Sequence, residues 1–191
     1  MLTDIEISNQ ANLPTKYGTF FVKAFKYQEK EHLALYTKEL TCKIPLVRIH
    51  SECLTGDALG SKKCDCGEQL EYALKAINKS ECGVLIYLRQ EGRNIGLLNK
   101  INAYNLQDQG FDTIEANHQL GFSADERTYE VAEYILEYLG IKEIELLTNN
   151  PKKLESFQNI KIAKRVPIII DANKYNILYL KTKKEKSGHL L

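Results

Sequence analysis

Three of the five cysteines stand close together in the sequence, as Cys53, Cys64 and Cys66 with the spacing C-x10-C-x-C. Thiolates are soft ligands, and tetrahedral sites built from sulfur favour zinc. Structural zinc sites are usually closed by four protein ligands, whereas catalytic sites hold the ion with three and leave a position for water. The local count of three therefore favours a catalytic zinc, which would lower the pKa of water and supply a nucleophile near neutral pH.

Two other interpretations of this segment remain open from spacing alone. A fourth ligand, such as the nearby His50, would close the site and make the zinc structural. The stretch HSE at residues 50–52 also matches the H-x-E of zinc deaminases, which pair it with P-C-x-x-C. This chain has C-D-C at residues 64–66 instead, which argues against a deaminase.

Two further segments combine groups that suit phosphate. The stretch RQEGRNIG, residues 89–96, carries two glycines and two arginines and is expected to follow a strand and open a helix. Backbone N–H groups at a helix N-terminus and guanidinium groups both bind anions. In TNNPKK, residues 148–153, Asn150 is expected to cap a helix with Lys152 and Lys153 in its first turn. Lysine charges there oppose the helix dipole, and a bound anion would remove that penalty. Ordinary exposed side chains would explain either segment alone.

The segment SADER places Asp125 and Arg127 close together. Ser123 and Glu126 have the spacing of a capping box, which predicts a helix over 123–140. Asp125 and Arg127 are therefore expected in its first turn. The helix dipole alone would explain Asp125. His118, a few residues earlier, suits a core position as well as a catalytic one, and the sequence leaves that choice open.

These segments fall between alternating strand-like and helix-like patterns. Strands are expected within residues 32–40, 43–50, 83–90 and 143–148, with two more within 159–170; helices are expected over 68–80, 95–110 and 123–140 and from residue 151. This alternation predicts the α/β class, as a single compact domain with a mixed β-sheet flanked by helices. Each candidate segment lies at a strand-to-helix turn, where ligands of α/β proteins collect.

Composition narrows the class of protein. The 191 residues suffice for one domain, and 43% hydrophobic with 27% charged residues is typical of a globular protein. A formal net charge of +1 gives no basic excess, so no nucleic-acid partner is expected. No apolar run is long enough to cross a membrane, and the N-terminus lacks the pattern of a secretion signal. A cytoplasmic location is therefore expected.

The other two cysteines and the C-terminal end have plainer expected roles. The cytosol keeps thiols reduced, so a disulfide is not expected, and Cys42 and Cys82 are interpreted as buried packing residues. The lysine-rich stretch from Tyr179 is expected to be a solvated end, flexible from about residue 180.

Taken together, the segments resemble one known family. RIHSECLTGDALGSKKCDCGEQL (48–70), RQEGRNIGLLNKINAYNLQDQGFDTIEANHQLGF (89–122), ADER (124–127) and LLTNNPKK (146–153) occur in the order found in the GTP cyclohydrolase II family. The resemblance extends over nearly the whole chain and implies the first step of riboflavin biosynthesis. In that step GTP loses C8 of guanine as formate and also pyrophosphate, giving 2,5-diamino-6-ribosylamino-4(3H)-pyrimidinone 5′-phosphate. The length fits the stand-alone form, and a homodimer is implied.

The resemblance also implies a role for each matching residue. Cys53, Cys64 and Cys66 would hold one catalytic Zn²⁺ per chain, and Mg²⁺ would accompany the phosphates of GTP. Asp125 would be the general base, Arg127 a nucleophile on the α-phosphate, and Tyr104 would lie near the reacting base. The implied GTP contacts are Arg48, Ile49, His50, Ser51, Glu52, Gln69, Glu91, Gly92, Arg93, Thr113, Thr148 and Lys153. Lys63 stands where the family commonly has arginine.

Three alternatives accompany this interpretation. A guanidinium stays protonated near pH 7, so Arg127 could act as an electrostatic clamp on the α-phosphate instead of a nucleophile. A paralogue with the same motifs could perform only part of the reaction. A non-catalytic nucleotide-binding protein with a closed structural zinc is the third alternative.

Overall fold

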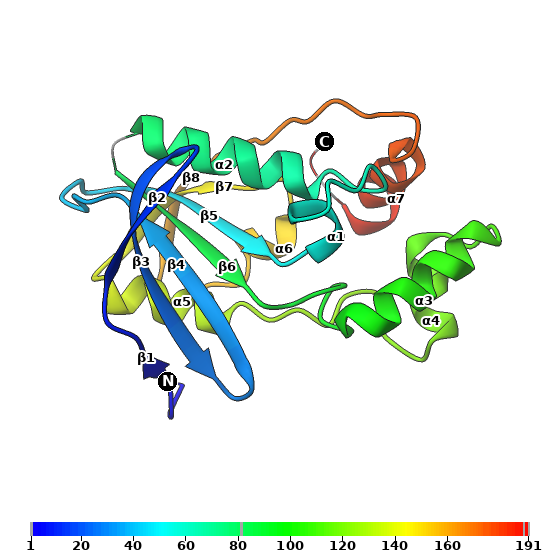
Figure 1. Ribbon diagram of the computed structural model, residues 1–191, viewed down its shortest axis with the longest axis horizontal. Helices are drawn as coiled ribbons and strands as arrows, with labels where there is room; N and C mark the ends of the chain where they lie inside the picture. Colours follow the sequence, from blue (N-terminus) through cyan, green and yellow to red (C-terminus); the bar gives the residue numbers. More distant parts are fainter. Residues whose placement is uncertain (1, 81, 189, 191) are drawn as a thin grey trace.

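A mixed sheet of eight strands forms the centre of the molecule in the computed structural model, which describes residues 2–80, 82–188 and 190 (Figure 1). The strands are β1 (Glu6–Ile7), β2 (Ala11–Thr15), β3 (Gly18–Tyr27), β4 (Lys30–Tyr36), β5 (Leu46–Ser51), β6 (Gly83–Leu88), β7 (Glu143–Leu147) and β8 (Lys161–Val166). Their order is β1-β3-β4-β6-β5-β7-β8, with β2 also paired to β3. Pairing is antiparallel from β1 to β6 and parallel across β6, β5, β7 and β8. The predicted mixed α/β fold is confirmed.

Helices cover both faces of the sheet (Figure 1). They are α1 (Leu54–Asp57), α2 (Cys66–Ser80), α3 (Gly96–Asp108), α4 (Thr113–Gln119), α5 (Glu130–Tyr138), α6 (Pro151–Leu154) and α7 (Ile177–Ser187). A hydrophobic core lies on each face of the sheet, and alternate side chains of β6 enter one or the other. Val84 and Ile86 share a buried cluster with α5, whereas Leu85 shares one with α2. A strand buried on both faces needs apolar residues at every position, which explains the unbroken run GVLIYL.

The parallel strands β5, β6 and β7 place their carboxyl ends at one edge of the sheet. From this edge the chain continues into α1, α3 and α6 respectively. The predicted cap of α6 is confirmed, because the Asn150 side chain accepts a hydrogen bond from the Lys152 N–H (3.0 Å) and Pro151 is the first helical residue. None of the helices in the described ranges has the length and apolar character needed to cross a membrane.

The helix predicted over residues 123–140 begins later than expected. Helix α5 starts at Glu130, and residues 124–129 form an irregular segment. The Glu126 side chain does accept from the Ser123 N–H (2.8 Å), but the Glu126 N–H donates to the Arg93 carbonyl (3.2 Å). This contact with a distant loop replaces the first helical turn, so Asp125 and Arg127 lie before the helix and not in it.

Only one of the two strands predicted within residues 159–170 forms. Strand β8 ends at Val166, because Pro167 has no N–H to continue the ladder. The next N–H, that of Ile168, donates to the Asn149 side chain (3.2 Å) and not to a strand. The segment therefore leaves the sheet and returns toward the end of β7.

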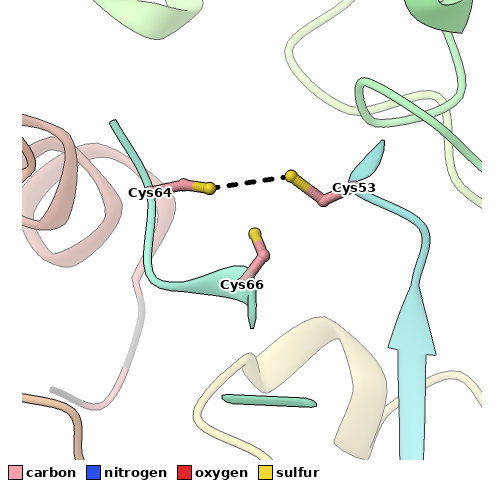
Figure 2. A group of neighbouring side chains, drawn as sticks. All are labelled: Cys53, Cys64 and Cys66. Atoms are coloured by element: carbon pink, nitrogen blue, oxygen red, sulfur yellow. Dashed lines mark hydrogen bonds between the residues drawn. The ribbon is translucent and has the colours of Figure 1, made fainter. Parts of the chain in front are cut away.

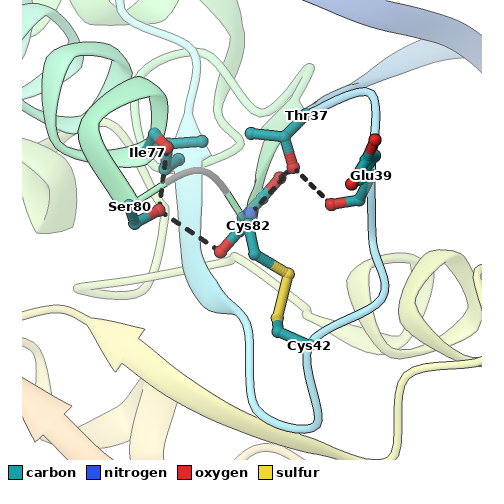
Figure 3. The surroundings of a disulfide bond; sticks show 7 residues. Thr37, Glu39, Cys42, Ile77, Ser80 and Cys82 are labelled. Atoms are coloured by element: carbon teal, nitrogen blue, oxygen red, sulfur yellow. Dashed lines mark hydrogen bonds between the residues drawn. A yellow bond between two sulfur atoms is a disulfide. The ribbon is translucent and has the colours of Figure 1, made fainter.

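The expectation that Cys42 and Cys82 are free packing residues is wrong. Their sulfur atoms are bonded, joining the loop after β4 to the start of β6 (Figure 3). Beside the bridge, the Thr37 hydroxyl accepts from the Gly83 N–H (3.1 Å). Residues 40 apart in the sequence reach bonding distance here because β4 and β6 are neighbours in the sheet.

The expectation of a wholly solvated C-terminal end is wrong for Lys183. Residues Ile177–Ser187 form helix α7 (Figure 1), and a Cβ on Gly188, at its C-terminal end, would lie 3.7 Å from the side chain of Pro151 in α6. The Lys183 ammonium pairs with Asp65 (2.8 Å), and its side chain is 12% exposed. Lys181 and Lys184 are exposed, as the sequence predicted.

Candidate active site

A cavity of about 290 Å³ opens at the carboxyl ends of β5, β6 and β7. Nearly all the predicted site residues line it: the three cysteines with Tyr104, Asp125 and Arg127, and Arg48, His50, Ser51, Glu52, Gln69, Glu91, Gly92, Arg93, Thr113, Thr148 and Lys153. Ile49 is the exception, since its side chain is in the core, although its carbonyl accepts from the Lys153 ammonium (2.7 Å). His118 is exposed and does not line the cavity.

Cys53, Cys64 and Cys66 point toward one another at one side of this cavity (Figure 2). Their sulfur atoms all lie within 4.8 Å of one another, and those of Cys53 and Cys64 are 3.6 Å apart. A tetrahedral zinc with bonds of about 2.3 Å keeps its sulfurs about 3.8 Å apart, so this cluster fits zinc closely. Among the described residues, no histidine or carboxylate joins the three thiols in the cluster.

Two helix starts bring the thiols together. Cys53 precedes α1 and Cys66 begins α2, and these helices touch at their glycines. A Cβ on Gly56 would lie 2.8 Å from the Cys64 sulfur and 3.1 Å from that of Cys53, and a Cβ on Gly67 would lie 2.3 Å from the Gly56 carbonyl. Contacts under 3.0 Å cannot be accommodated without movement of the sulfur or the backbone.

Replacing Gly56 with alanine is therefore expected to weaken metal binding by about 10-fold or more, the scale of other changes just outside a metal's ligands. Competition against a chromogenic chelator measures the affinity. The matched control is Leu59→Ala in the same loop, where the side chain is 74% exposed. Wild-type affinity in Gly56→Ala would contradict the close packing described here.

Lys100, which the sequence analysis missed, lies against the thiol cluster. Its ammonium donates to the Cys53 sulfur (3.1 Å) and to Glu91 (2.7 Å). Burial alone would lower the pKa of Lys100, but the hydrogen bond to Glu91 and the Cys53 charge outweigh burial and raise it. Hydrogen bonds from the Cys64 and Cys66 thiols, together with Lys100, hold the pKa of Cys53 well below its usual range. Cys53 is thus held as the thiolate, the form that binds metal, whereas the hydrogen bonds to Cys53 raise the pKa of the Cys64 and Cys66 thiols.

Asp57, which the sequence analysis also missed, orients three surrounding residues through hydrogen bonds. Its carboxylate accepts from the Tyr87 hydroxyl (2.7 Å), from the Cys53 N–H (3.0 Å) and from Nε2 of His50 (3.1 Å). Burial lowers the pKa of His50, so the ring is neutral and Nε2 carries the proton. Among the described residues, neither ring nitrogen of His50 belongs to the thiol cluster, so His50 does not close it, and Nδ1 is left as an acceptor.

Three buried cations gather in the same cavity. Arg48 donates to the Leu147 carbonyl (2.9 Å) and to Gln69 (2.6 Å), and burial lowers its pKa to about 10. Burial and the charges of Arg48 and Arg127 hold the pKa of Lys153 well below its usual range. Cations that destabilise one another in this way are stabilised by an anion between them.

Arg127 makes a bidentate ion pair with Asp125. Its Nε and Nη2 donate to the two carboxylate oxygens, each at 2.7 Å. Burial disfavours the charged form of both groups, but the pair outweighs burial, so the pKa of Asp125 is lowered and that of Arg127 is raised. Both side chains are therefore held in the charged state.

The loop that opens α3 has an unusual backbone. Gly92 (φ 63°), Arg93 (φ 61°) and Asn94 (φ 77°) all adopt the left-handed conformation, which is uncommon for residues other than glycine. A Cβ on Gly92 would lie 3.0 Å from the Lys100 Cβ. Arg93 donates to the Ala124 carbonyl (3.0 Å), which joins this loop to the segment with Asp125.

Helices α3 and α4 supply another part of the cavity wall. The Tyr104 hydroxyl lies 3.3 Å from that of Thr55, and burial raises the pKa of Tyr104. Thr113 is the first residue of α4, where Asp112 and Glu115 form a capping box that the sequence analysis did not identify. The Thr113 hydroxyl is buried and lacks a hydrogen-bond partner within the described residues.

Most of the buried side-chain polar atoms that lack a hydrogen-bond partner in the described residues belong to residues that line this cavity. Seven such side-chain atoms occur in the described part of the chain, and five belong to residues that line this cavity: Arg48 Nε, His50 Nδ1, Ser51 Oγ, Gln90 Oε1 and Thr113 Oγ1. Buried polar groups in native proteins almost always have a partner. Their gathering in one place is typical of a site that binds a polar ligand.

Comparisons with known proteins identify the family of the chain. The family model described as GTP cyclohydrolase II matches residues 6–167. The chain is 65% identical over 189 residues to the GTP cyclohydrolase-2 of Campylobacter hominis, covering 98% of this chain and 96% of that protein. It is 55% identical over 191 residues to the GTP cyclohydrolase-2 of Helicobacter pylori strain Shi470, covering 98% of each. A solved two-domain 3,4-dihydroxy-2-butanone 4-phosphate synthase from A. baumannii is similar with a TM-score of 0.47 and 21% identity, over 86% of this chain and 41% of that one. A family match over most of the chain and relatives of this similarity over nearly their full length show that the chain belongs to the GTP cyclohydrolase II family.

Proposed function

We propose that the protein hydrolyses GTP, opening the imidazole ring of guanine to release C8 as formate and releasing pyrophosphate, as the first step of riboflavin biosynthesis. The product is 2,5-diamino-6-ribosylamino-4(3H)-pyrimidinone 5′-phosphate. One observation carries this proposal: a single cavity contains both a three-thiol cluster and a group of buried cations. The first suits a metal-assisted hydrolysis, and the second suits the phosphates of the same substrate.

The thiol cluster is proposed to hold one zinc ion per chain. When bound, zinc lowers the pKa of water and so supplies the nucleophile that opening an imidazole ring requires. Three protein thiolates carry a large negative charge, and the Lys100 ammonium offsets part of it through its contact with Cys53 (3.1 Å). The neutral Nδ1 of His50 and the Tyr104 hydroxyl are available to orient the guanine by hydrogen bonds.

The cationic part of the cavity is proposed to bind the triphosphate. Arg48 and Lys153 are buried beside Arg127, and a phosphate there would offset the burial that lowers the pKa of Arg48 and of Lys153. A Mg²⁺ ion would accompany the phosphates, because Mg²⁺ in nucleotide sites is held largely by phosphate oxygens and water. Glu91 and the strained turn at Gly92 and Arg93 would fix the position of the nucleotide.

We favour the electrostatic role for Arg127. Asp125 stabilises the protonated guanidinium through two hydrogen bonds, whereas a nucleophile must first lose that proton. A protonated Arg127 can neutralise charge on the α-phosphate as pyrophosphate leaves. In the alternative, Asp125 accepts a proton from Arg127, the freed nitrogen bonds to the α-phosphorus, and the bond from that phosphorus to the leaving pyrophosphate breaks.

The reaction is tested by quantifying formate and pyrophosphate from GTP, with ATP as the control nucleotide. Equal amounts of both products from GTP, and neither from ATP, are expected. Pyrophosphate without formate, or formamide-stage product alone, would identify a paralogue that performs part of the reaction. GTP binding without any product would favour a non-catalytic nucleotide-binding protein.

We further propose that the protein is a homodimer, and apolar side chains exposed on α3 are candidates for the contact. Leu98 is 76% exposed, and Leu97 (40%) and Ile101 (47%) lie beside it on the helix. Leu98→Asp is expected to convert the dimer to a monomer, measured as molar mass by light scattering. Ile169→Asp, at a 74% exposed position elsewhere, is the matched control. A monomeric wild-type protein would contradict the dimer, and a dimeric Leu98→Asp would exclude this face.

A further inference from the structure

Helix α7 lies outside the residues that the family model matches, which end at 167, and yet it forms part of the cavity wall. Tyr179 and Lys183 line the cavity together with the thiols and the cations. The Lys183 ammonium lies 4.4 Å from the centre of the Tyr179 ring, so the two side chains form one surface. A helix expected to be a solvated end thus contributes two side chains to the site.

Contacts at both ends hold α7 in this position. Before the helix, Asn176 is fully buried and its side chain accepts from the Asn173 N–H (2.8 Å). After it, Gly188 adopts a left-handed conformation (φ 66°), and the Leu190 N–H donates to the Asn149 carbonyl (2.9 Å). Asn149 itself lines the cavity, so the end of α7 is joined directly to the segment that follows β7.

The Lys183 ammonium reaches the loop that carries the thiols. It pairs with Asp65 at 2.8 Å, and the two side chains are only 12% and 2% exposed. Asp65 stands between Cys64 and Cys66 in the sequence. A carboxylate buried to this degree is strongly destabilising unless it is paired.

A chain of hydrogen bonds continues from Asp65 into the cationic part of the cavity. The second oxygen of Asp65 accepts from the Gln69 amide, whose own oxygen accepts from Arg48 Nη2 (2.6 Å). Arg48 in turn donates to the Leu147 carbonyl at the end of β7 (2.9 Å). Lys183 therefore ends a network that connects the loop between Cys64 and Cys66 with the proposed phosphate site.

We propose that Lys183 is a positioning residue for the metal: by neutralising Asp65 it holds Cys64 and Cys66 at the spacing that a metal ion needs. This inference rests on the proposed metal site described above. The ion pair with Asp65 is the contact through which Lys183 acts on this loop. A purely structural role would instead stabilise α7 without changing how firmly the thiols hold a metal.

The test compares Lys183→Met with Lys184→Met in the full-length, zinc-loaded protein. Lys184 is the exposed neighbour on the same helix and provides the matched control. We expect zinc to transfer to a chromogenic chelator about 10-fold faster or more from Lys183→Met, the effect usual for partners of metal ligands, and at the wild-type rate from Lys184→Met. Thermal unfolding confirms that every variant is folded at the assay temperature.

Two further variants separate positioning from simple loss of stability. Lys183→Arg keeps the positive charge, so we expect this variant to release zinc at a rate close to that of the wild-type protein and more slowly than Lys183→Met. Combining Lys183→Met with Asp65→Asn removes the unpaired carboxylate, so the double variant is expected to release zinc more slowly than Lys183→Met alone. Wild-type zinc release from Lys183→Met would overturn this inference and leave the metal site intact. A wild-type protein that binds no zinc would overturn both the proposed metal site and the role of Lys183.

Discussion

Replacing Cys64 with serine is expected to abolish metal retention and formate release, with a loss of at least about 100-fold in each. Loss of a residue that merely hydrogen-bonds to a metal ligand costs about 10- to 100-fold in metal affinity. Here one of the three thiols in the cluster is itself removed. Serine is close to cysteine in size, so the packing around Gly56 is preserved. Metal content is measured after dialysis, and formate is measured during turnover of GTP.

The matched control for Cys64→Ser is the double variant Cys42→Ser/Cys82→Ser. It also replaces cysteine sulfur with oxygen, but at the disulfide that joins the loop after β4 to β6, and neither residue lines the cavity. We expect this variant to retain its metal and its turnover. Full formate release by Cys64→Ser would show that the thiol cluster is not the reaction centre.

Replacing Arg127 with alanine is expected to slow pyrophosphate release by about 100- to 1,000-fold, the cost of removing one group that stabilises a charged transition state. The change also leaves Asp125 without its bidentate partner, and the side chain of that residue is only 13% exposed. Arg127→Lys keeps the positive charge but cannot form both hydrogen bonds. We expect it to be about 10-fold more active than Arg127→Ala. Pyrophosphate is measured with a coupled assay at saturating GTP.

Intact-mass spectrometry of the wild-type protein quenched during turnover distinguishes the two roles of Arg127. The electrostatic role predicts unmodified protein at every time point. A transient adduct with the mass of a guanylyl group, absent from Arg127→Ala, would instead establish the nucleophilic role. Substantial turnover by Arg127→Ala would contradict both, because each requires this side chain at the α-phosphate.

The parts of the site that could be predicted from the sequence are those encoded locally. The spacing of Cys53, Cys64 and Cys66 indicated a three-thiol cluster, and the structure brings these sulfurs within 4.8 Å. Asn150 and Pro151 are a local helix start, and they form one. The β-branched-rich segments KIPLVRIH and GVLIYLRQ predicted strands, and β5 and β6 form at these segments.

The parts that could not be predicted depend on contacts between distant segments. Lys100 reaches Cys53 across 47 positions, and Lys183 reaches Asp65 across 118. A lysine in an exposed helix and a lysine beside a buried carboxylate look alike in a sequence. The late start of α5 has the same origin, since Glu126 donates to the carbonyl of Arg93, more than 30 residues earlier.

Asp57 is an intermediate case. It lies four residues after Cys53, close enough in the sequence to suggest a partner for that segment. Its actual role depends on Tyr87 and His50, which belong to the neighbouring strands β6 and β5. Only the pairing of those strands brings the three side chains together.

The most direct test of the central claim, that the thiol cluster holds the metal used in hydrolysis of GTP, is a zinc titration of metal-free protein. GTP labelled with ¹³C at C8 is added with Mg²⁺, and labelled formate is followed by NMR while pyrophosphate is assayed in the same sample. Formate production should rise linearly with added zinc and stop rising at one equivalent per chain, with pyrophosphate in equal amount. Formate production by the metal-free protein at the full rate, or none at any zinc content, would contradict the claim.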